Sequence, residues 1–414
     1  MRSLVAFELK KILSRRVTQV TVASLFVVLA LVMALNVLQQ SGTDDAGNDV
    51  SGLAAIAQKK ANAEADAGLV TEERATEAIR AYQTFFDSDG QIDEAFLAGG
   101  LSDPDSFYRY ENRHVAFLGL LMRPWMVGYE SVSDVAPRID ASTTVPLYDK
   151  VAASVQATLD NASDTWGYTP AERDFWMQKY ESTAKPVAYG YAGGWSDILS
   201  CIDFLIFAIV AACVAAAPVF AGEYQDRTDA LVLSTRHGKG RLVAAKLVAA
   251  FLLSTAIYAL YAAVVVGVPL AFFGADGAGL PLQSIRLSIP YDVTMAQAVG
   301  ICVGIGWLLT LGMTGFTLFL SAKLRSQLAI FALCVAVLLL PLFLPTLPSS
   351  LANHALTLLP LNGISFANLF TAFASYAAGP VVFDLQTALV AAYVLVLALT
   401  VPLSARAFRR HQVV

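Results

Sequence analysis

Six stretches of this sequence are apolar over the roughly 17 or more residues that a helix needs to cross a bilayer. The first, residues 17–38, carries no charged side chain. With a rise of about 1.5 Å per residue, such a helix covers a hydrocarbon core of about 30 Å. The composition agrees, since 56% of the residues are hydrophobic and the mean hydropathy is +0.58. The sequence therefore predicts an all-α membrane protein with six transmembrane helices, at residues 17–38, 197–220, 242–273, 293–320, 327–345 and 385–405.

A long polar stretch, residues 39–196, separates the first two predicted spans. Within it, Ser41 to Ser196 holds 24 of the 33 acidic residues of the chain but 12 of the 28 basic ones. The apolar run 115–125 is too short to span and predicts either a domain core or a membrane-facing patch. Because helix-favouring residues dominate, we expect a large, mainly helical domain, with helices near 53–67, 72–86, 105–121, 147–159 and 170–180, the last capped by Thr169 and opened by Pro170.

The basic residues predict the orientation. They cluster before the first span, between the second and third, between the fourth and fifth, and after the sixth. The connection at 346–384 contains no Lys or Arg. Because basic loops stay on the cytoplasmic side, we expect both termini, the segment 221–241 and the tail 406–414 in the cytoplasm, and the 39–196 domain outside the cell.

Two further segments are expected at membrane surfaces. Residues 1–16 place Val5, Leu9, Ile12 and Leu13 on one helical face, which is typical of an amphipathic interfacial helix. The alternative is a basic flank that only orients the first span. The apolar connection 346–384 predicts short re-entrant helices, because unpaired loop backbone cannot enter the outer leaflet.

The sequence contains no motif for catalysis, cofactors or metals. The Gly238-Lys239 pair is followed by Gly240, and Leu233 stands where a phosphate-binding loop needs its first glycine. The four histidines have no metal-ligand spacing, and the four cysteines lie in apolar segments without a disulfide framework. We therefore expect a chain that is not itself an enzyme and binds no cofactor, metal or nucleic acid.

One segment of the polar domain is similar to part of a calcium-binding loop. Asp87 to Asp93 alternates oxygen-bearing side chains around Gly90. In the twelve-residue pattern, however, Phe85 and Phe96 fall where the first and last carboxylates belong. We therefore predict a turn between two helices, bent at Asp89 or Gly90.

Two features inside the predicted spans each have two interpretations. Asp203, near the outer end of the second span, either lines a substrate path or meets Arg286, or else reaches the interface as a helix cap beside Ser196 and Asp197. Small residues in the fourth span, which favour tight helix crossings, serve either packing within the subunit or dimerisation; they are Gly300, Gly304, Gly312 and Gly315.

The segment after the second span resembles the membrane-spanning permeases of the type 2 ATP-binding-cassette exporters. The matching features are a glutamate closing the span, a Gly-Thr pair or similar, a leucine-rich turn ending in Ser/Thr, a basic residue, and a lysine opening the third span. Here they are Glu223, Arg227-Thr228, Leu231 to Thr235, Arg241 and Lys246. Arg227 stands where that family usually has glycine.

The resemblance implies a permease subunit in a bacterial plasma membrane, surrounded by lipid and paired with a second permease as a homodimer or heterodimer. A separate cytoplasmic ATPase subunit would receive the segment in a groove and drive a substrate out of the cell. The residues support such a contact independently, since Asp226 to Leu233 favours a short helix that presents Leu231 and Leu233. The site predicted for ATPase coupling is therefore Glu223, Asp226, Arg227, Leu231, Leu233 and Arg241.

Two alternatives remain at this point. The segment 221–241 is alternatively a basic loop that only sets topology. The whole chain is alternatively a non-transporting membrane receptor or cell-surface scaffold whose outer domain binds a ligand.

Overall fold

Five helical stretches are long and apolar enough to cross a membrane, by length and composition, among the residues that the computed structural model describes. They are Arg16–Leu38, Gly193–Gln225, Arg241–Phe273, Met295–Lys323 and Leu385–Arg409. The predicted fifth span forms α16 (Gln327–Phe343), an apolar helix of 17 residues that is shorter than these. Five of the six predicted spans therefore coincide with helices of spanning length, and the count of six stays a prediction. The structure describes residues 1–97, 100–103, 105–162, 166–228, 240–344, 347, 349–379 and 381–409.

The chain divides into two units, which we describe separately. We call residues 1–33, 200–268 and 300–414 the helical unit, and residues 34–199 and 269–299 the insert unit. Helices outweigh strands in both, which confirms the mainly helical class.

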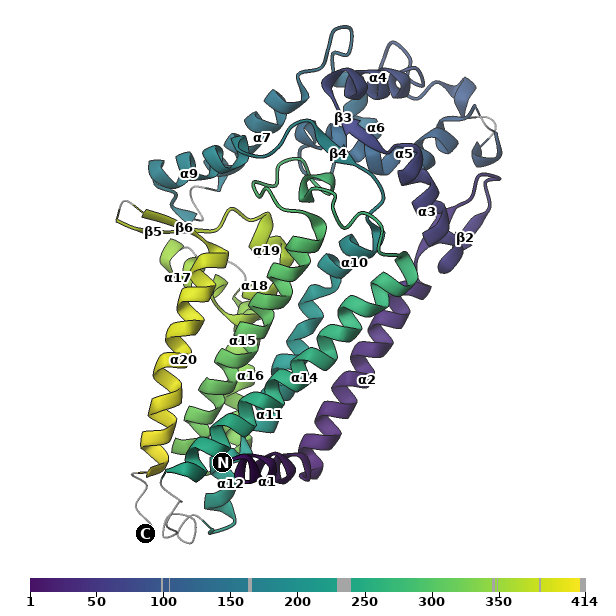
Figure 1. The fold of residues 1–414 in the computed structure, drawn as a ribbon. Helices are drawn as coiled ribbons and strands as arrows, with labels where there is room; N and C mark the ends of the chain where they lie inside the picture. Colours follow the sequence, from purple (N-terminus) through teal and green to yellow (C-terminus); the bar gives the residue numbers. More distant parts are fainter. Residues whose placement is uncertain are drawn as a thin grey trace. The chain divides into compact units, whose positions relative to one another are not determined.

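The helical unit takes its elements, wholly or in part, from both ends and the middle of the chain. Figure 1 shows α1 lying across the end of α2 rather than in line with it. The elements are α1 (Arg2–Leu13), α2 (Arg16–Leu38), the 3-10 turn η5 (Ile202–Leu205), α11 (Ile206–Ala216), α12 (Pro218–Gln225), α14 (Arg241–Phe273), α15 (Met295–Lys323), α16, α17 (Ser350–Thr357), α18 (Pro360–Ile364), α19 (Phe366–Phe370), the antiparallel pair β5 (Ser375–Ala378) and β6 (Val381–Asp384), and α20 (Leu385–Arg409).

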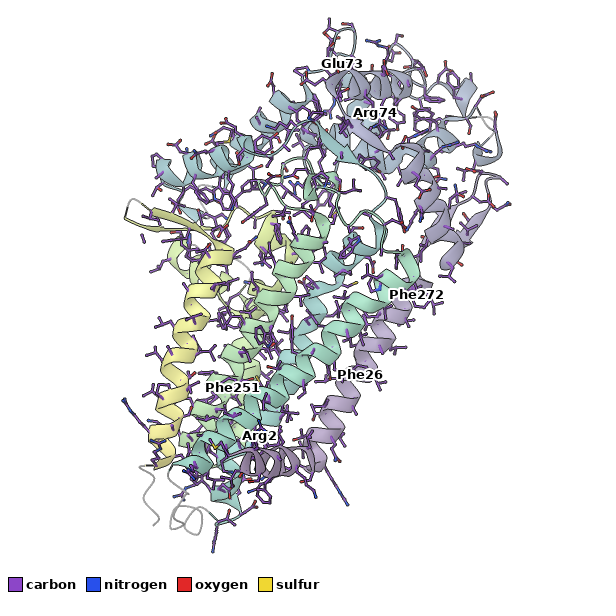
Figure 2. The ribbon with its side chains drawn as sticks, in the orientation of Figure 1. Arg2, Phe26, Glu73, Arg74, Phe251 and Phe272 are labelled. Carbon is purple, nitrogen blue, oxygen red and sulfur yellow. The ribbon has the colours of Figure 1, made fainter. Side chains whose placement is uncertain are left out.

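Apolar side chains and close crossings hold this unit together. Phe26 of α2, which is labelled in Figure 2, meets Tyr261 of α14 edge to face, with ring centroids 5.6 Å apart. On α15, a side chain at Gly312 would collide with Tyr393 of α20. By contrast, a Cβ added at Gly300 would have no neighbour within 4 Å. Gly312 therefore serves packing within the subunit, one of the two predicted uses of these glycines.

The predicted short helices between residues 346 and 384 are present as α17, α18 and α19. Their insertion into a membrane stays a prediction. The β5–β6 hairpin that follows them was not predicted from the sequence.

The insert unit is helical with two small antiparallel sheets. Strand β3 pairs with β4, so the beginning and end of the insert meet, with Val70 opposite Val187. The elements are β1 (Ser41–Thr43), β2 (Asp49–Ser51), α3 (Leu53–Ala65), β3 (Gly68–Val70), α4 (Glu72–Gln83), η1 (Glu94–Phe96), η2 (Gly100–Ser102), α5 (Phe107–Met122), η3 (Arg123–Trp125), α6 (Val132–Val135), η4 (Ala136–Arg138), α7 (Leu147–Asn161), α9 (Pro170–Glu181), β4 (Val187–Tyr189), α10 (Gly193–Cys201) and η6 (Leu282–Ser284).

Five insert helices lie where the sequence places them, and α9 carries the predicted signals at its start. The hydroxyl of Thr169 accepts a hydrogen bond from the backbone N–H of Glu172, and the Glu172 carboxylate accepts one in return from the N–H of Thr169. This capping box, with Pro170 in the first turn, confirms the predicted start of α9. Leu118 and Met122 belong to the buried core, so the apolar run 115–125 forms core rather than a membrane-facing patch.

The calcium-like segment forms a tight turn. The backbone N–H of Asp87 donates to the carbonyl of Gln91 at 2.8 Å, and its carboxylate accepts from the N–H groups of Asp89 and Gln91. Gly90 has φ +75°, a left-handed conformation that glycine adopts without steric cost. The Asp87 carboxylate thus closes the turn, as the turn interpretation predicts.

Candidate functional site

The predicted coupling segment, residues 221–241, begins within the last two turns of α12, which ends at Gln225. The N–H of Thr228 donates to the carbonyl of Glu223 at 3.0 Å, and the N–H of Arg227 to the carbonyl of Tyr224 at 3.4 Å. These two bonds are the Schellman pattern that closes many helices, in which glycine usually takes the left-handed position. Here Arg227 takes it, with φ +53°. Arg227, which stands where the family usually has glycine, therefore has a backbone conformation that favours glycine.

Four charged side chains from three separate parts of the sequence meet beside this helix end. The Lys246 ammonium lies 2.9 Å from the Glu8 carboxylate and 2.6 Å from that of Glu223. Lys11 also contacts Glu223, at 2.6 Å. We call Glu8, Lys11, Glu223 and Lys246 the ionic cluster. It joins α1, α12 and α14.

The ionic cluster is buried. The side chains of Lys246, Glu223 and Glu8 are 1%, 2% and 4% exposed, while Lys11 is 34% exposed. The hydroxyl of Thr228 donates a further hydrogen bond to Glu223. Isolated charges in such a place cost several kcal/mol, so the two carboxylates and two ammonium groups stabilise one another. The cluster has no formal net charge.

A second contact ties Arg15, the residue before α2, to α12. The Arg15 guanidinium lies 3.8 Å from the Asp226 carboxylate. It also lies against Gly222, where an added Cβ would collide with it. Arg15 can therefore approach this closely only because residue 222 is glycine and has no side chain.

Neighbouring helices complete the anchoring of α12. Pro218 opens this helix, and the Ser321 hydroxyl of α15 accepts hydrogen bonds from the N–H groups of Phe220 and Ala221, both at 3.0 Å. The same hydroxyl donates to the carbonyl of Ala217 at 2.7 Å. These bonds satisfy backbone groups that a helix start leaves without partners in its own helix.

The structure brings some of the predicted coupling residues together. Glu223 is at the centre of the ionic cluster, Asp226 caps α12, and Arg227 is the left-handed residue. Arg241 begins α14 and is exposed. The two leucines expected to contact a partner, Leu231 and Leu233, lie outside the described residues.

Sequence reasoning missed Glu8 and Lys11 as members of this site and named Lys246 only as part of a motif. A signal was present, since Glu8 is the single acidic residue among the first 43 and Lys246 the single charged residue between positions 242 and 275. A lone charge in an apolar helix calls for a partner. Which charges meet depends on tertiary packing.

Residues 2–412 match the family described as ABC-2 family transporter protein. The chain belongs to this family. Membership identifies a multi-pass membrane permease component of an ABC transporter, and it implies association with an ATPase subunit. It also favours the permease over the receptor alternative. No curated protein and no solved structure gave a significant match.

Asp203 of the permease lies in the 3-10 turn η5, where the span Gly193–Gln225 departs from α-helix. Its carboxylate accepts a hydrogen bond from the side chain of Ser365, and the residue is exposed. Of its proposed capping partners, Asp197 accepts instead from Asn36, at 2.9 Å. A role for Asp203 in a substrate path stays a prediction.

Proposed function

We propose that this permease exports a substrate by coupling to a separate cytoplasmic ABC ATPase through the segment 221–241. The observation that supports the proposal most is the ionic cluster. It binds α12 and α14, the two helices that flank the segment, to each other and to α1. A displacement of the segment is therefore passed to all three helices together.

The chemistry of the cluster suits such a role. The two ion pairs of Lys246 are 2.6 and 2.9 Å long and almost entirely buried, so salt and water weaken them little. Separating one pair inside the protein leaves an uncompensated charge, which costs about 3–5 kcal/mol. The three helices consequently move as one body under loads that would break an exposed ion pair of about 0–1 kcal/mol.

The direction of transport follows from the proposed orientation. The basic connections place the termini and the segment 221–241 in the cytoplasm and residues 39–196 outside the cell. In this arrangement the ATPase meets the permease from inside, and closure of a pair of permeases, identical or different, moves the substrate outward. A bacterial plasma membrane is the location that we propose.

Coupling is tested by purifying the tagged chain from its native membrane and identifying the ATPase that accompanies it. We expect a nucleotide-binding subunit with the unaltered chain and its loss with Leu231→Asp/Leu233→Asp. The matched control is Leu53→Asp/Leu69→Asp, because these two leucines of the insert unit are 59% and 55% exposed. Retention of the ATPase by the 231/233 variant would remove the segment from the contact.

Orientation is tested by labelling single cysteines in intact cells with a maleimide that does not cross membranes. The natural cysteines are buried, so the label reports introduced ones. We expect labelling of Asp45→Cys, in the exposed linker of the insert unit, and none of Arg241→Cys until the cells are opened. The opposite pattern would reverse the proposed direction.

A further inference from the structure

The insert unit contains a cavity of approximately 450 Å³, a size typical of small-molecule sites. The helices α5 and α7, the turn η3 and the chain around Arg286 line it. On α7, the lining residues Ala153, Ser154 and Ala157 are small, which leaves the space open. The coupling proposal does not use this cavity.

Three basic side chains line the cavity, and its described lining includes no Asp or Glu. They are Arg123, Lys150 and Arg286. Arg286 is partly buried, and its guanidinium Nε donates to the hydroxyl of Ser288 at 3.0 Å. No ion pair joins Arg123 or Arg286 to a carboxylate within the described part of the chain. The cavity is therefore positively charged within an acidic domain.

The two arginines are close enough to disfavour each other's charge. Burial and the nearby Arg123 guanidinium lower the pKa of Arg286 from its ordinary value. Both effects disfavour the charged form of Arg286, and an anion bound between the two guanidinium groups would offset them. The free protein thus holds a positive pair that a ligand would stabilise.

The rest of the wall combines polar side chains, those of Ser154, Thr158, Asn161 and Ser288, with an apolar part. Leu120 and Leu287 are buried, and Trp125 and Met126 are partly buried. The Lys150 ammonium lies 5.8 Å from the centre of the Trp125 ring. An apolar surface beside a basic one is complementary to a molecule that has an anionic head and a hydrocarbon part.

From this arrangement we propose that the cavity binds a phosphate-bearing amphiphile, with its phosphate at Arg123 and Arg286 and its apolar part against Trp125. Guanidinium groups match phosphate oxygens with paired hydrogen bonds. The described lining has three basic groups and no acidic one, which suits a doubly charged phosphate ligand better than a singly charged carboxylate ligand. The site is independent of the coupling proposal, so either can fail alone.

The test uses the full chain in phosphatidylcholine nanodiscs and isothermal titration with dihexanoyl-phosphatidate. Dihexanoyl-phosphatidylcholine and inorganic phosphate serve as comparison ligands. We expect the phosphatidate to bind most tightly of the three. Equal binding of the choline lipid would overturn the anionic part of the proposal, and equal binding of inorganic phosphate would overturn the amphiphile part.

Variants locate the site. Arg286→Gln is expected to weaken binding roughly 10- to 100-fold, the range of a lost charge-assisted hydrogen bond, and Trp125→Ala to weaken it less. The matched control is Arg113→Gln, because Arg113 is an exposed arginine of α5 that does not line the cavity. Unchanged binding in Arg123→Gln/Arg286→Gln, or no binding to the unaltered chain, would overturn the proposal.

A second measurement separates ligand binding from a structural role. Because Arg123 and Arg286 repel each other, Arg286→Gln should keep or raise the thermal stability of the ligand-free chain. A lowered stability would instead make Arg286 a structural residue and overturn its assignment to the site. Nanodiscs that contain long-chain phosphatidate distinguish the source of the ligand. If the bilayer phosphatidate competes with dihexanoyl-phosphatidate, the ligand is a bilayer lipid; if it does not, the ligand is a soluble amphiphile. Both outcomes support the site.

Discussion

Replacing Lys246 by methionine tests the ionic cluster directly. Methionine has nearly the same length as lysine but no charge, so it fills the space and leaves the two carboxylates without their shared cation. Glu223 keeps Lys11, whereas Glu8 has no second ion-pair partner among the described residues. The substitution therefore leaves one buried carboxylate uncompensated.

The size of the effect follows from this count. Removing one partner of a buried ion pair costs about 3–5 kcal/mol, and the remaining Lys11 contact places Lys246→Met near the lower end. The double variant Glu8→Gln/Lys246→Met removes both charges of the broken pair and should recover about 2 kcal/mol of the loss. This recovery distinguishes a charge effect from a packing effect.

The assay is the free energy of unfolding from a denaturant titration in nonionic detergent. The control is Lys10→Met, because Lys10 is an exposed lysine of α1 without an ion pair in the described structure, and its change should stay within about 0.5 kcal/mol. A loss below about 1 kcal/mol for Lys246→Met, or a double variant as unstable as the single one, would refute the reasoning.

Three further perturbations have expected outcomes in the same assay. Arg227→Gly should change the free energy of unfolding by less than about 1 kcal/mol. Relief of the left-handed backbone strain stabilises the folded chain, the added entropy of the unfolded chain destabilises it, and the two effects are of similar size. A larger loss would show that Arg227 is not strained. Ser321→Ala should cost about 1–3 kcal/mol by leaving two backbone amides of α12 without their acceptor, and no change would indicate that water replaces the hydroxyl. In the insert unit, the hydrogen bond from Lys60 lowers the pKa of Asp276 below its ordinary value of 3.8. The stabilisation from the Lys60–Asp276 contact is therefore present above pH 3.8 and is lost as the pH falls through the lowered pKa of Asp276. Asp276→Asn should remove this contribution to the loss of stability in acid.

Local signals made much of the fold predictable. Three of the five predicted insert helices begin at a residue whose side chain caps them, namely Thr71, Ser106 and Thr169, and the long spans follow from long apolar stretches of sequence. The small sheets were not predictable in the same way, because β3 and β4 have three residues each and pair across more than a hundred positions. Strands this short carry no clear alternation, and their partners are set by tertiary structure.

The candidate site was predictable only in part. Glu223 stood out because it closes a span, but its neighbours Glu8 and Lys11 belong to a terminal helix that the sequence describes only as amphipathic. Of the apolar face predicted there, Ile12 is buried and Leu13 is 47% exposed, while the charged Glu8 is buried. Helical periodicity alone ranks a charged residue as exposed, and it cannot anticipate a partner from another helix.

The charge balance of the cluster explains why three separate segments are needed at one place. Glu223 contacts two lysines and Lys246 contacts two glutamates, so each of these central residues has a partner in α1 as well as in the other helix. Without α1, Glu223 and Lys246 would form one pair with unused hydrogen-bonding capacity inside the protein, which is costly. The terminal helix is therefore part of the structure that holds both ends of the segment 221–241, and shortening it should loosen that segment even if every span remains intact.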